Sequence, residues 1–286
     1  MSLKEYRKVG WLFGTVGWLA LLSYCQTPPA SKTTVAEGMS EKGTPSRLEI
    51  DLADLEKAGA MPAPEIIDVL YDPVFQKPKR YEAIPLRGWL EKYVTENQLD
   101  TATTELIFLC KDGYNPGMPL GSVVRHEPYL AIRDLDAPSG QTWADTLAGK
   151  WPPFYLVWTG HRKGTKGFTW PYGLAYLQFQ PADRVYAAAV PTASEQMIGF
   201  ELYRDKCMKC HALNGVGGQM GPEMNVPKNI TEYWQIDDIK AFVRNPYAYR
   251  YNSKMPPVAN LSDYELDQIV AYLSYMKQQK IAVDDL

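Results

Sequence analysis

The chain has 286 residues, more than one typical domain of about 150 residues, which favours two modules joined by connecting segments. With 45% hydrophobic and 22% charged residues it has an ordinary globular composition, which excludes a disordered, collagen-like or many-span membrane protein. The 30 basic and 33 acidic residues give a net charge of −3, so the overall charge does not favour nucleic acid as a partner. Because the chain has only 4 cysteines and 3 histidines, their spacing is informative.

Residues 1–25 have the pattern of an export signal. Three basic side chains lie within residues 1–8, and an uncharged apolar run leads up to Cys25. Leu22-Ser-Tyr-Cys25 resembles a bacterial lipobox, in which the cysteine becomes the lipidated first residue; the alternative is an uncleaved N-terminal anchor helix. No adjacent pair of arginines precedes the apolar run, which favours the ordinary unfolded export route. Both interpretations place the remaining chain on the periplasmic side of the bacterial cytoplasmic membrane.

A flexible linker and an α+β domain are expected next. Residues 26–47 are rich in Pro, Ser, Thr and Gly and poor in large apolar side chains, so they cannot bury enough surface to fold. Over residues 48–189, short β-rich runs alternate with turn signals and two short helices, which indicates a mixed α+β domain. The expected strands lie at 47–52, 105–110, 129–132, 154–158 and 174–179, and the expected helices at 85–94 and 142–147. The periodicity becomes helical over 190–286.

Cys207-Met-Lys-Cys210-His211 is the strongest chemical signal in the chain. Two thiols three positions apart can add across both vinyl groups of one haem, while the adjacent imidazole reaches the iron. A redox dithiol, half of a zinc site or chance would also explain the two cysteines, but the following histidine and the export signal favour haem. The motif therefore predicts one covalent haem c. His126 and His161 have no second His or Cys at ligand spacing and are expected to be surface or hydrogen-bonded residues.

Two amphipathic helices are expected on either side of this motif. Thr192-Ala-Ser-Glu195 and Ser262-Asp-Tyr-Glu265 each have the spacing of a capping box, and an apolar stripe follows each of them. Gly199 on the first helix has no side chain, so this helix could approach Tyr272 on the last helix closely and close the fold over the haem.

Residues 191–280 resemble a class I c-type cytochrome domain. Gly199 and Tyr203 lie eight and four positions before Cys207, where that family has a glycine and an aromatic residue. Gly217-Gly-Gln-Met-Gly-Pro222 and Lys254-Met-Pro-Pro257 follow the cysteine motif, as the family pattern requires.

The resemblance implies the surroundings of the iron. The carbonyl of Pro222 would bind the imidazole of His211, which fixes the ring and raises its basicity. Met220, Met224 and Met255 are candidates for the sixth ligand, because a thioether suits ferrous haem and raises its potential. The family pattern puts the axial methionine at Met255, where two following prolines stiffen the loop, so Met220 and Met224 become pocket or loop residues. An iron with both axial positions filled favours outer-sphere electron transfer over substrate binding.

A second resemblance covers residues 48–185. Phe108-Leu-Cys-Lys-Asp-Gly-Tyr114 and Trp170-Pro-Tyr-Gly173 resemble a small, reduced form of the sulfite-oxidase-like molybdopterin-binding fold. In catalytic relatives a cysteine two positions before an acidic-Gly-aromatic triplet ligates molybdenum, and Cys110 has that position. The segment is short for wrapping a pterin, and the signal lacks the twin arginines used to export cofactor-loaded proteins. A cofactor-free domain is therefore expected, with a molybdenum cofactor as the alternative.

Together these features predict a multidomain chain with an N-terminal signal or anchor, an α+β middle domain and an all-α cytochrome c domain. The predicted function is a membrane-tethered, extracytoplasmic mono-haem cytochrome, an electron carrier rather than a catalyst. Its expected partners are a membrane respiratory complex or a periplasmic reductase or oxidase, with Lys206, Lys209 and Lys254 available to steer docking. Two alternatives stay open: an oxidoreductase that passes substrate electrons from molybdenum to the haem, and a structural haem subunit of a respiratory complex.

Overall fold

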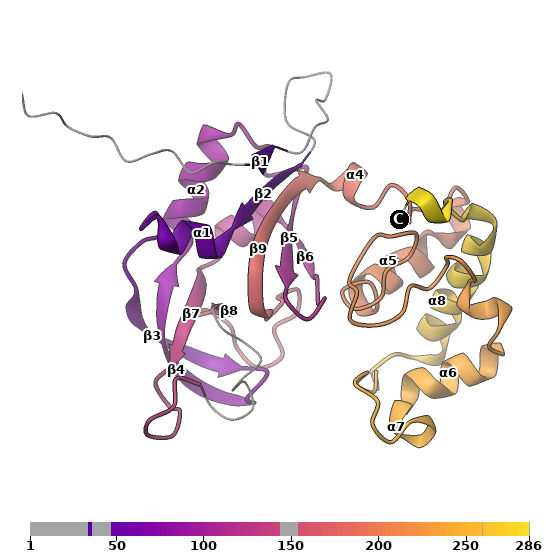
Figure 1. The fold of residues 1–286 in the computed structure, drawn as a ribbon. Coiled ribbons are helices and arrows are strands. Elements are labelled where there is room, and N and C mark those ends of the chain that lie inside the picture. The colour runs from indigo at the N-terminus through magenta and orange to yellow at the C-terminus, as the bar shows by residue number, and fades with distance from the viewer. Residues whose placement is uncertain (1–33, 36–46, 144–153, 259, 286) are drawn as a thin grey trace, which may run out of the picture. The chain divides into compact units, whose positions relative to one another are not determined.

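The computed structural model describes residues 34–35, 47–143, 154–258 and 260–285 (Figure 1). The predicted export signal with Cys25 and most of the predicted linker lie outside the described residues, as does most of the helix expected at 142–147. None of the helices in the described ranges is long and apolar enough to cross a membrane. All described residues belong to one compact unit, Ser31–Leu286.

An antiparallel sheet of nine strands, curved into a half-barrel, makes up the first part of the described chain (Figure 1). The strands are β1 (Thr34–Val35), β2 (Leu48–Asp51), β3 (Glu65–Asp72), β4 (Lys77–Pro85), β5 (Thr104–Cys110), β6 (Gly117–Pro119), β7 (Pro128–Asp134), β8 (Phe154–Trp158) and β9 (Tyr172–Pro181). Their order is β1-β2-β9-β8-β7-β4-β3, and β5 pairs with both β9 and β6. Strand β9 is therefore central, because it bonds to β2, β5 and β8.

The core of the half-barrel comes from the apolar faces of these strands. Strand β8 is buried along its whole length, which matches its uninterrupted apolar sequence. The largest fully buried side chains include Tyr81, Phe108, Trp158 and Phe179. Within the described part of this domain, four short helices accompany the sheet: α1 (Leu52–Lys57), α2 (Arg87–Glu96), α3 (Leu120–Arg125) and α4 (Ala182–Val185).

The five predicted strands are all present, and β8 agrees with its prediction residue for residue. The hairpin of β3 and β4 is not predicted by the sequence. Its turn, residues 73–76, has no Asn-Gly or Asp-Gly signal, and Gln76 adopts a left-handed φ of 55° that is uncommon for a glutamine. Partners across the sheet hold this turn, so local sequence alone does not reveal it.

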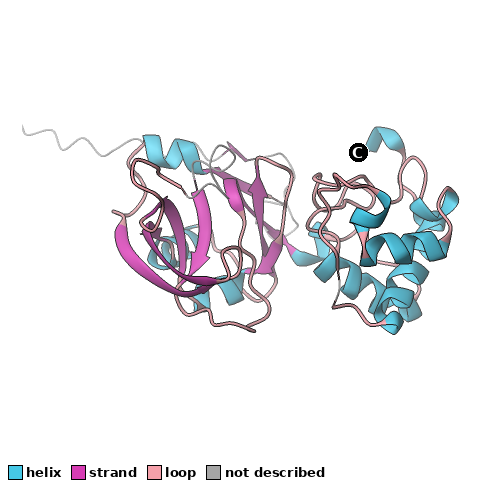
Figure 2. Ribbon diagram, turned by 90° about the horizontal axis from the view of Figure 1, so that it is seen from below, coloured by secondary structure: helices cyan, strands magenta, loops and turns pink. Residues whose placement is uncertain are grey.

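The residues after 190 are helical (Figure 2). The helices are η1 (Ser194–Gln196), α5 (Met197–Lys206), η2 (Ile230–Glu232), α6 (Ile236–Arg244), α7 (Pro246–Tyr249), α8 (Asp263–Met276), η3 (Lys277–Gln279) and η4 (Val283–Asp285). The predicted order of a β-rich domain before a helical domain is therefore confirmed.

Gly199 allows α5 and α8 to meet at very short range. A methyl group at Gly199 would lie 2.3 Å from the carbonyl oxygen of Gln268 and 2.5 Å from Cβ of Tyr272. The rings of Tyr203 and Tyr272 pack beside this contact, with centroids 5.6 Å apart. The predicted approach of Gly199 to Tyr272 is confirmed, and its reason is the missing side chain.

The capping box predicted for the last helix is present at the start of α8. The amide of Ser262 donates to a carboxylate oxygen of Glu265 at 2.8 Å, and the amide of Glu265 donates to the Ser262 hydroxyl at 3.2 Å. These bonds satisfy two of the amides that a helix start leaves without intrahelical partners.

The capping box predicted at Thr192 is wrong. Helix η1 has Ala193 as its N-cap and no side-chain cap hydrogen bond. The Thr192 hydroxyl lies 2.6 Å from the hydroxyl of Tyr275, and its amide donates to Gln279 at 3.0 Å. Tertiary partners at the end of α8 and in η3 therefore take the polar groups that a local cap would have used.

Three buried asparagines connect the loop after the cysteine motif to the end of α8. The Asn225 amide group donates to the side chain of Asn214 at 2.8 Å and to the carbonyl of Met276 at 2.9 Å. The Asn229 amide group donates to the Asn225 side chain and to the carbonyl of Leu273, each at 2.7 Å. The chain of amides thus satisfies carbonyls that the last turn of α8 leaves open.

We expect Asn225→Ala to lower the free energy of unfolding by about 2 kcal/mol, because it removes the side-chain partner of three buried groups, on Asn214, Asn229 and Met276. Urea unfolding followed by circular dichroism measures this difference. The matched control is Asn260→Ala at an exposed position, which should change stability little. Equal stability of the two variants would contradict the role assigned to Asn225.

Candidate functional site

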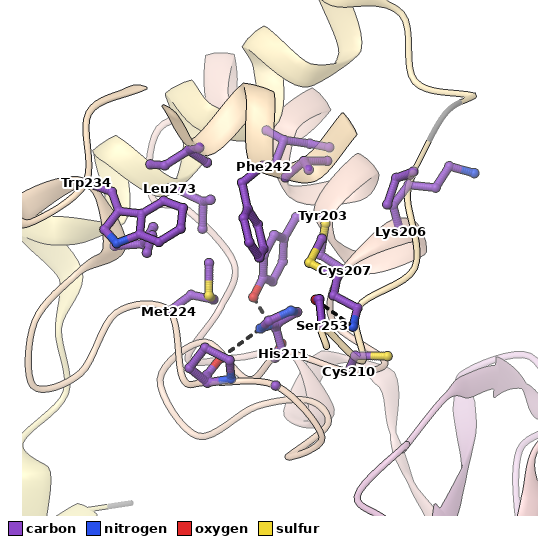
Figure 3. Close-up of a pocket in the computed structure, with 18 of the residues that line it drawn as sticks. Tyr203, Lys206, Cys207, Cys210, His211, Met224, Trp234, Phe242, Ser253 and Leu273 are labelled. Carbon is purple, nitrogen blue, oxygen red and sulfur yellow. Dashed lines mark hydrogen bonds between the residues drawn. The ribbon is translucent and has the colours of Figure 1, made fainter. Parts of the chain in front are cut away.

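A cavity of about 450 Å³ lies within the helical domain, next to the cysteine motif. Its apolar walls include Ile230, Trp234, Ile239, Phe242, Val243, Leu266, Ile269, Val270 and Leu273. Figure 3 shows Met224, Trp234, Phe242 and Leu273 gathered around the same space as the His211 ring. The cavity suits a large, mostly apolar group with a few polar contacts.

The structure brings Cys207, Cys210 and His211 together on one wall of this cavity. Helix α5 ends at Lys206, and the amides of Cys210 and His211 both donate to the carbonyl of Cys207, at 3.0 and 2.9 Å. A single tight turn therefore presents two thiols and an imidazole. Both cysteines are free, and burial raises the pKa of Cys207 to about 12, so its thiol is neutral in this apolar site.

The His211 ring is held in one orientation. Its Nδ1 atom lies 2.9 Å from the carbonyl oxygen of Pro222, the contact that the sequence predicts. Because a carbonyl only accepts hydrogen bonds, Nδ1 carries the proton and Nε2 presents its lone pair to the cavity. The Tyr203 hydroxyl donates to the His211 carbonyl at 3.0 Å, which also fixes the backbone of this residue.

Glycines after the motif make room for it. A methyl group at Gly221 would lie 2.3 Å from Cε1 of the His211 ring, and one at Gly218 would lie 2.1 Å from the Lys209 carbonyl. Gly217 has a φ of 123°, which favours glycine. The sequence predicts no separate role for these glycines, although three glycines within the five positions 217–221 are the signal that could have revealed one.

The three candidate methionines all line the cavity, but they come from different segments. The amide of Met224 donates to the carbonyl of Ala212 at 2.9 Å, which ties this residue to the backbone next to His211. Met220 belongs to the same segment and is 37% exposed. Met255 comes from the separate segment between α7 and α8, where its amide donates to the Ser253 hydroxyl at 3.2 Å.

Cys110 lies in the half-barrel, at the end of β5, and is not part of this cavity. Its sulfur is 3.9 Å from the carbonyl oxygen of Phe108. Burial, and then the nearby carboxylate of Asp112, raise the pKa of Cys110 well above its usual value. The thiol is therefore neutral and poorly placed to act as a thiolate.

The other two histidines differ from each other. The Nδ1 atom of His126 lies 2.6 Å from the Ser122 carbonyl, so its predicted hydrogen-bonded state is confirmed. His161 is buried against Phe168 and Trp170, so it is not a surface residue. Its Nδ1 atom has no hydrogen-bond partner among the described residues, so the predicted hydrogen bond is absent at this nitrogen. The ring of Tyr71, far earlier in the sequence, also stacks on His161 with centroids 6.2 Å apart, and the local pattern does not show this contact.

The helical part of the chain is similar to a known family. A family model described as cytochrome c oxidase, cbb3-type, subunit III matches residues 194–273. Residues 194–273 form a cytochrome c domain. The match does not extend to the half-barrel domain, which has no assigned family.

One curated relative shares part of the chain. The protein is 26% identical over 93 residues to cytochrome c oxidase subunit 2 of Alkalihalophilus pseudofirmus. This alignment covers 30% of the present chain and 27% of the relative, so the chain spans about a quarter of that relative's length. No solved structure matches the chain.

A cytochrome c domain implies covalent haem c, and the residues present fit this group. Two free thiols three positions apart border the cavity, and the neighbouring imidazole has Nε2 available because Nδ1 is engaged by Pro222. The apolar walls suit the porphyrin, and the helical domain is related to oxidase subunits. Electron transfer is a plausible activity of such a domain.

Proposed function

We propose that this protein is a mono-haem cytochrome that transfers single electrons between respiratory partners. Cys207 and Cys210 bind the haem through thioether bonds, and His211 and Met255 ligate its iron. The bond between Nδ1 of His211 and the Pro222 carbonyl is the observation that carries the proposal, because it leaves Nε2 directed to bind a metal at the cysteine motif. The haem supplies a reversible one-electron couple when bound.

The residues around the haem control this couple. The carbonyl of Pro222 holds the proton on Nδ1 of His211, which makes Nε2 of the imidazole a more basic ligand for the iron. The apolar side chains of the cavity exclude water, which disfavours the extra positive charge of ferric iron and raises the midpoint potential. With a methionine in the sixth position, no site is open for a substrate, so the reaction is outer-sphere electron transfer.

The proposed location is the periplasmic side of the bacterial cytoplasmic membrane. A lipid on Cys25 or a retained N-terminal helix would hold the chain there, and residues 26–47 would serve as the tether. Confinement by a short tether raises the effective concentration of the haem at membrane partners. The relation to oxidase subunits supports a membrane respiratory complex, or a periplasmic reductase or oxidase, as the partner.

For the half-barrel we propose a cofactor-free domain of the reduced sulfite-oxidase-like type. The segment is short for wrapping a pterin, the predicted signal lacks the twin arginines used to export cofactor-loaded proteins, and Cys110 is buried at the end of β5. Elemental analysis of the purified protein tests this proposal: stoichiometric molybdenum beside iron would overturn it and would favour the oxidoreductase alternative.

We expect the matured protein to carry one haem per chain, measured by its pyridine haemochrome spectrum. The haem should remain attached on a denaturing gel, and Cys207→Ser together with Cys210→Ser should remove it, because both thioether bonds are lost. The matched control is Cys110→Ser, which should leave the haem content unchanged. A colourless mature protein would refute the proposed function.

A further inference from the structure

The segment after β5 in the half-barrel touches the cysteine motif of the cytochrome domain. We call Lys111–Pro116 the Tyr114 loop. The amide of Asn115 in this loop donates to the carbonyl of Lys209 at 2.9 Å, between the two haem-binding cysteines. The amide of Gln219 donates in return to the carbonyl of Gly113 at 2.8 Å. Two backbone hydrogen bonds therefore join the loop to the motif and to the glycine-rich segment behind it.

Gly113 lets the two backbones meet without side chains between them. Its φ is 85°, and a methyl group there would lie 2.9 Å from the carbonyl carbon of Gln219 and from the amide nitrogen of Met220. Such distances are shorter than non-bonded contacts allow, so a side chain at Gly113 must push the loop away.

Tyr114 lies between Gly113 and Asn115 in this loop, and the Asn115 amide bonds to the carbonyl of Lys209, the residue before Cys210. Burial raises the pKa of the Tyr114 phenol, with Cys210 as the next largest cause. Side-chain bonds hold the loop in shape: Asp112 accepts from the Tyr114 amide at 3.0 Å, and Asn115 accepts from the Cys110 amide at 3.3 Å. The Asp-Gly-Tyr triplet that resembles a molybdenum-site motif is thus used here for a protein contact.

A separate contact also links the two domains. The hydroxyl of Tyr186, after α4, donates to the buried carboxylate of Glu105 on β5 at 2.7 Å. The guanidinium of Arg204 on α5 lies over the Tyr186 ring, 5.2 Å from its centroid. Since α5 leads directly into Cys207, this contact supports the position of the Tyr114 loop at the motif.

We propose that the Tyr114 loop is a built-in cover of the haem. The loop occupies the Cys210 side of the motif and therefore directs outside electron-transfer partners to residues 250–256. This inference rests on the proposed haem attachment at Cys207 and Cys210. The electron-transfer rate falls steeply with distance, and a partner cannot come close where the loop already makes backbone contact.

Residues 250–256 offer the alternative route. Arg250, Lys254 and Met255 line the haem cavity, and the first two are exposed at its rim. Tyr251 between them is 92% exposed. No acidic residue occurs in this segment, so it favours an acidic protein as its redox partner.

Gly113→Ala in the full, haem-loaded chain tests the cover. One electron passes from ferrous haem to hexacyanoferrate(III), and the second-order rate of this oxidation reports how accessible the haem is. We expect Gly113→Ala to raise the rate several-fold and to speed hydrogen exchange at the Asn115 and Gln219 amides. The control is Gly164→Ala, which has a similar φ of 88° but nothing within 4 Å of the added methyl group.

The route is tested by reversing one charge. At low salt, Lys254→Glu should slow oxidation by the anionic reagent several-fold, because it removes local attraction at the proposed rim. Lys163→Glu, an equal change of net charge at an exposed site in the half-barrel, should leave the rate unchanged. Equal slowing by both variants would overturn the assignment of residues 250–256.

Equal rates and equal amide exchange for Gly113→Ala and Gly164→Ala would overturn the cover. If Gly113→Ala does not fold, Tyr114→Ala replaces it and is expected to raise the oxidation rate in the same way; an unchanged rate again overturns the proposal. The pyridine haemochrome spectrum keeps the two proposals distinguishable. Absence of haem from the wild-type chain refutes the proposed function, whereas a haem-loaded chain that fails the rate test refutes only the cover.

Discussion

Replacing Met255 by alanine is expected to abolish the sulfur-to-iron absorption band of the oxidised protein in the far red. The midpoint potential should fall by on the order of 0.1 V or more, since axial ligands set haem potentials over a range of about 0.8 V. The ferrous iron of the variant should also bind carbon monoxide readily, because its sixth position becomes open. Visible spectroscopy and a redox titration measure these changes.

Met255 is proposed over the other two methionines because it comes from a different segment of the chain from His211. Met224 is tied to the backbone beside His211 through the carbonyl of Ala212, whereas Met255 comes from a separate segment before α8. Met224→Ala and Met220→Ala are therefore the controls and should keep the band. Loss of the band only in Met220→Ala would show the assignment to be wrong.

Gly199→Ala is expected to lower the free energy of unfolding by about 3 kcal/mol, the upper end of the usual cost of overpacking. The added methyl group would lie 2.3 Å from the Gln268 carbonyl oxygen, which is backbone and cannot rotate away. Helices α5 and α8 must then separate at the point where they close the haem cavity. Urea unfolding of the haem-loaded protein measures the loss.

Gly88→Ala is the matched control, because Gly88 is also a helical glycine, in α2, but has nothing within 4 Å of the added methyl group. Alanine has the higher helix propensity, so this variant should keep its stability or gain up to about 1 kcal/mol. A similar destabilisation by both substitutions would mean that the α5–α8 contact is not the cause.

The predictions that agree with the structure depend on local patterns. Strand β8 is an uninterrupted apolar run between turn signals. The capping box at the start of α8 needs only Ser262 and Glu265, which are three positions apart. The predictions that fail depend on distant partners. Thr192 has the spacing of a cap, but Tyr275 and Gln279, more than 80 residues later, take its polar groups.

By itself the sequence determined the cysteine motif and the type of domain that contains it. Covalent haem attachment requires Cys207, Cys210 and His211 within five consecutive positions, so the signal is complete in a short stretch of chain. Only the tertiary structure decided which groups meet this motif from elsewhere, including the asparagine chain to α8 and the Tyr114 loop. The physical reason is that these contacts are backbone and amide hydrogen bonds between distant segments, and such bonds leave no periodic pattern along the chain.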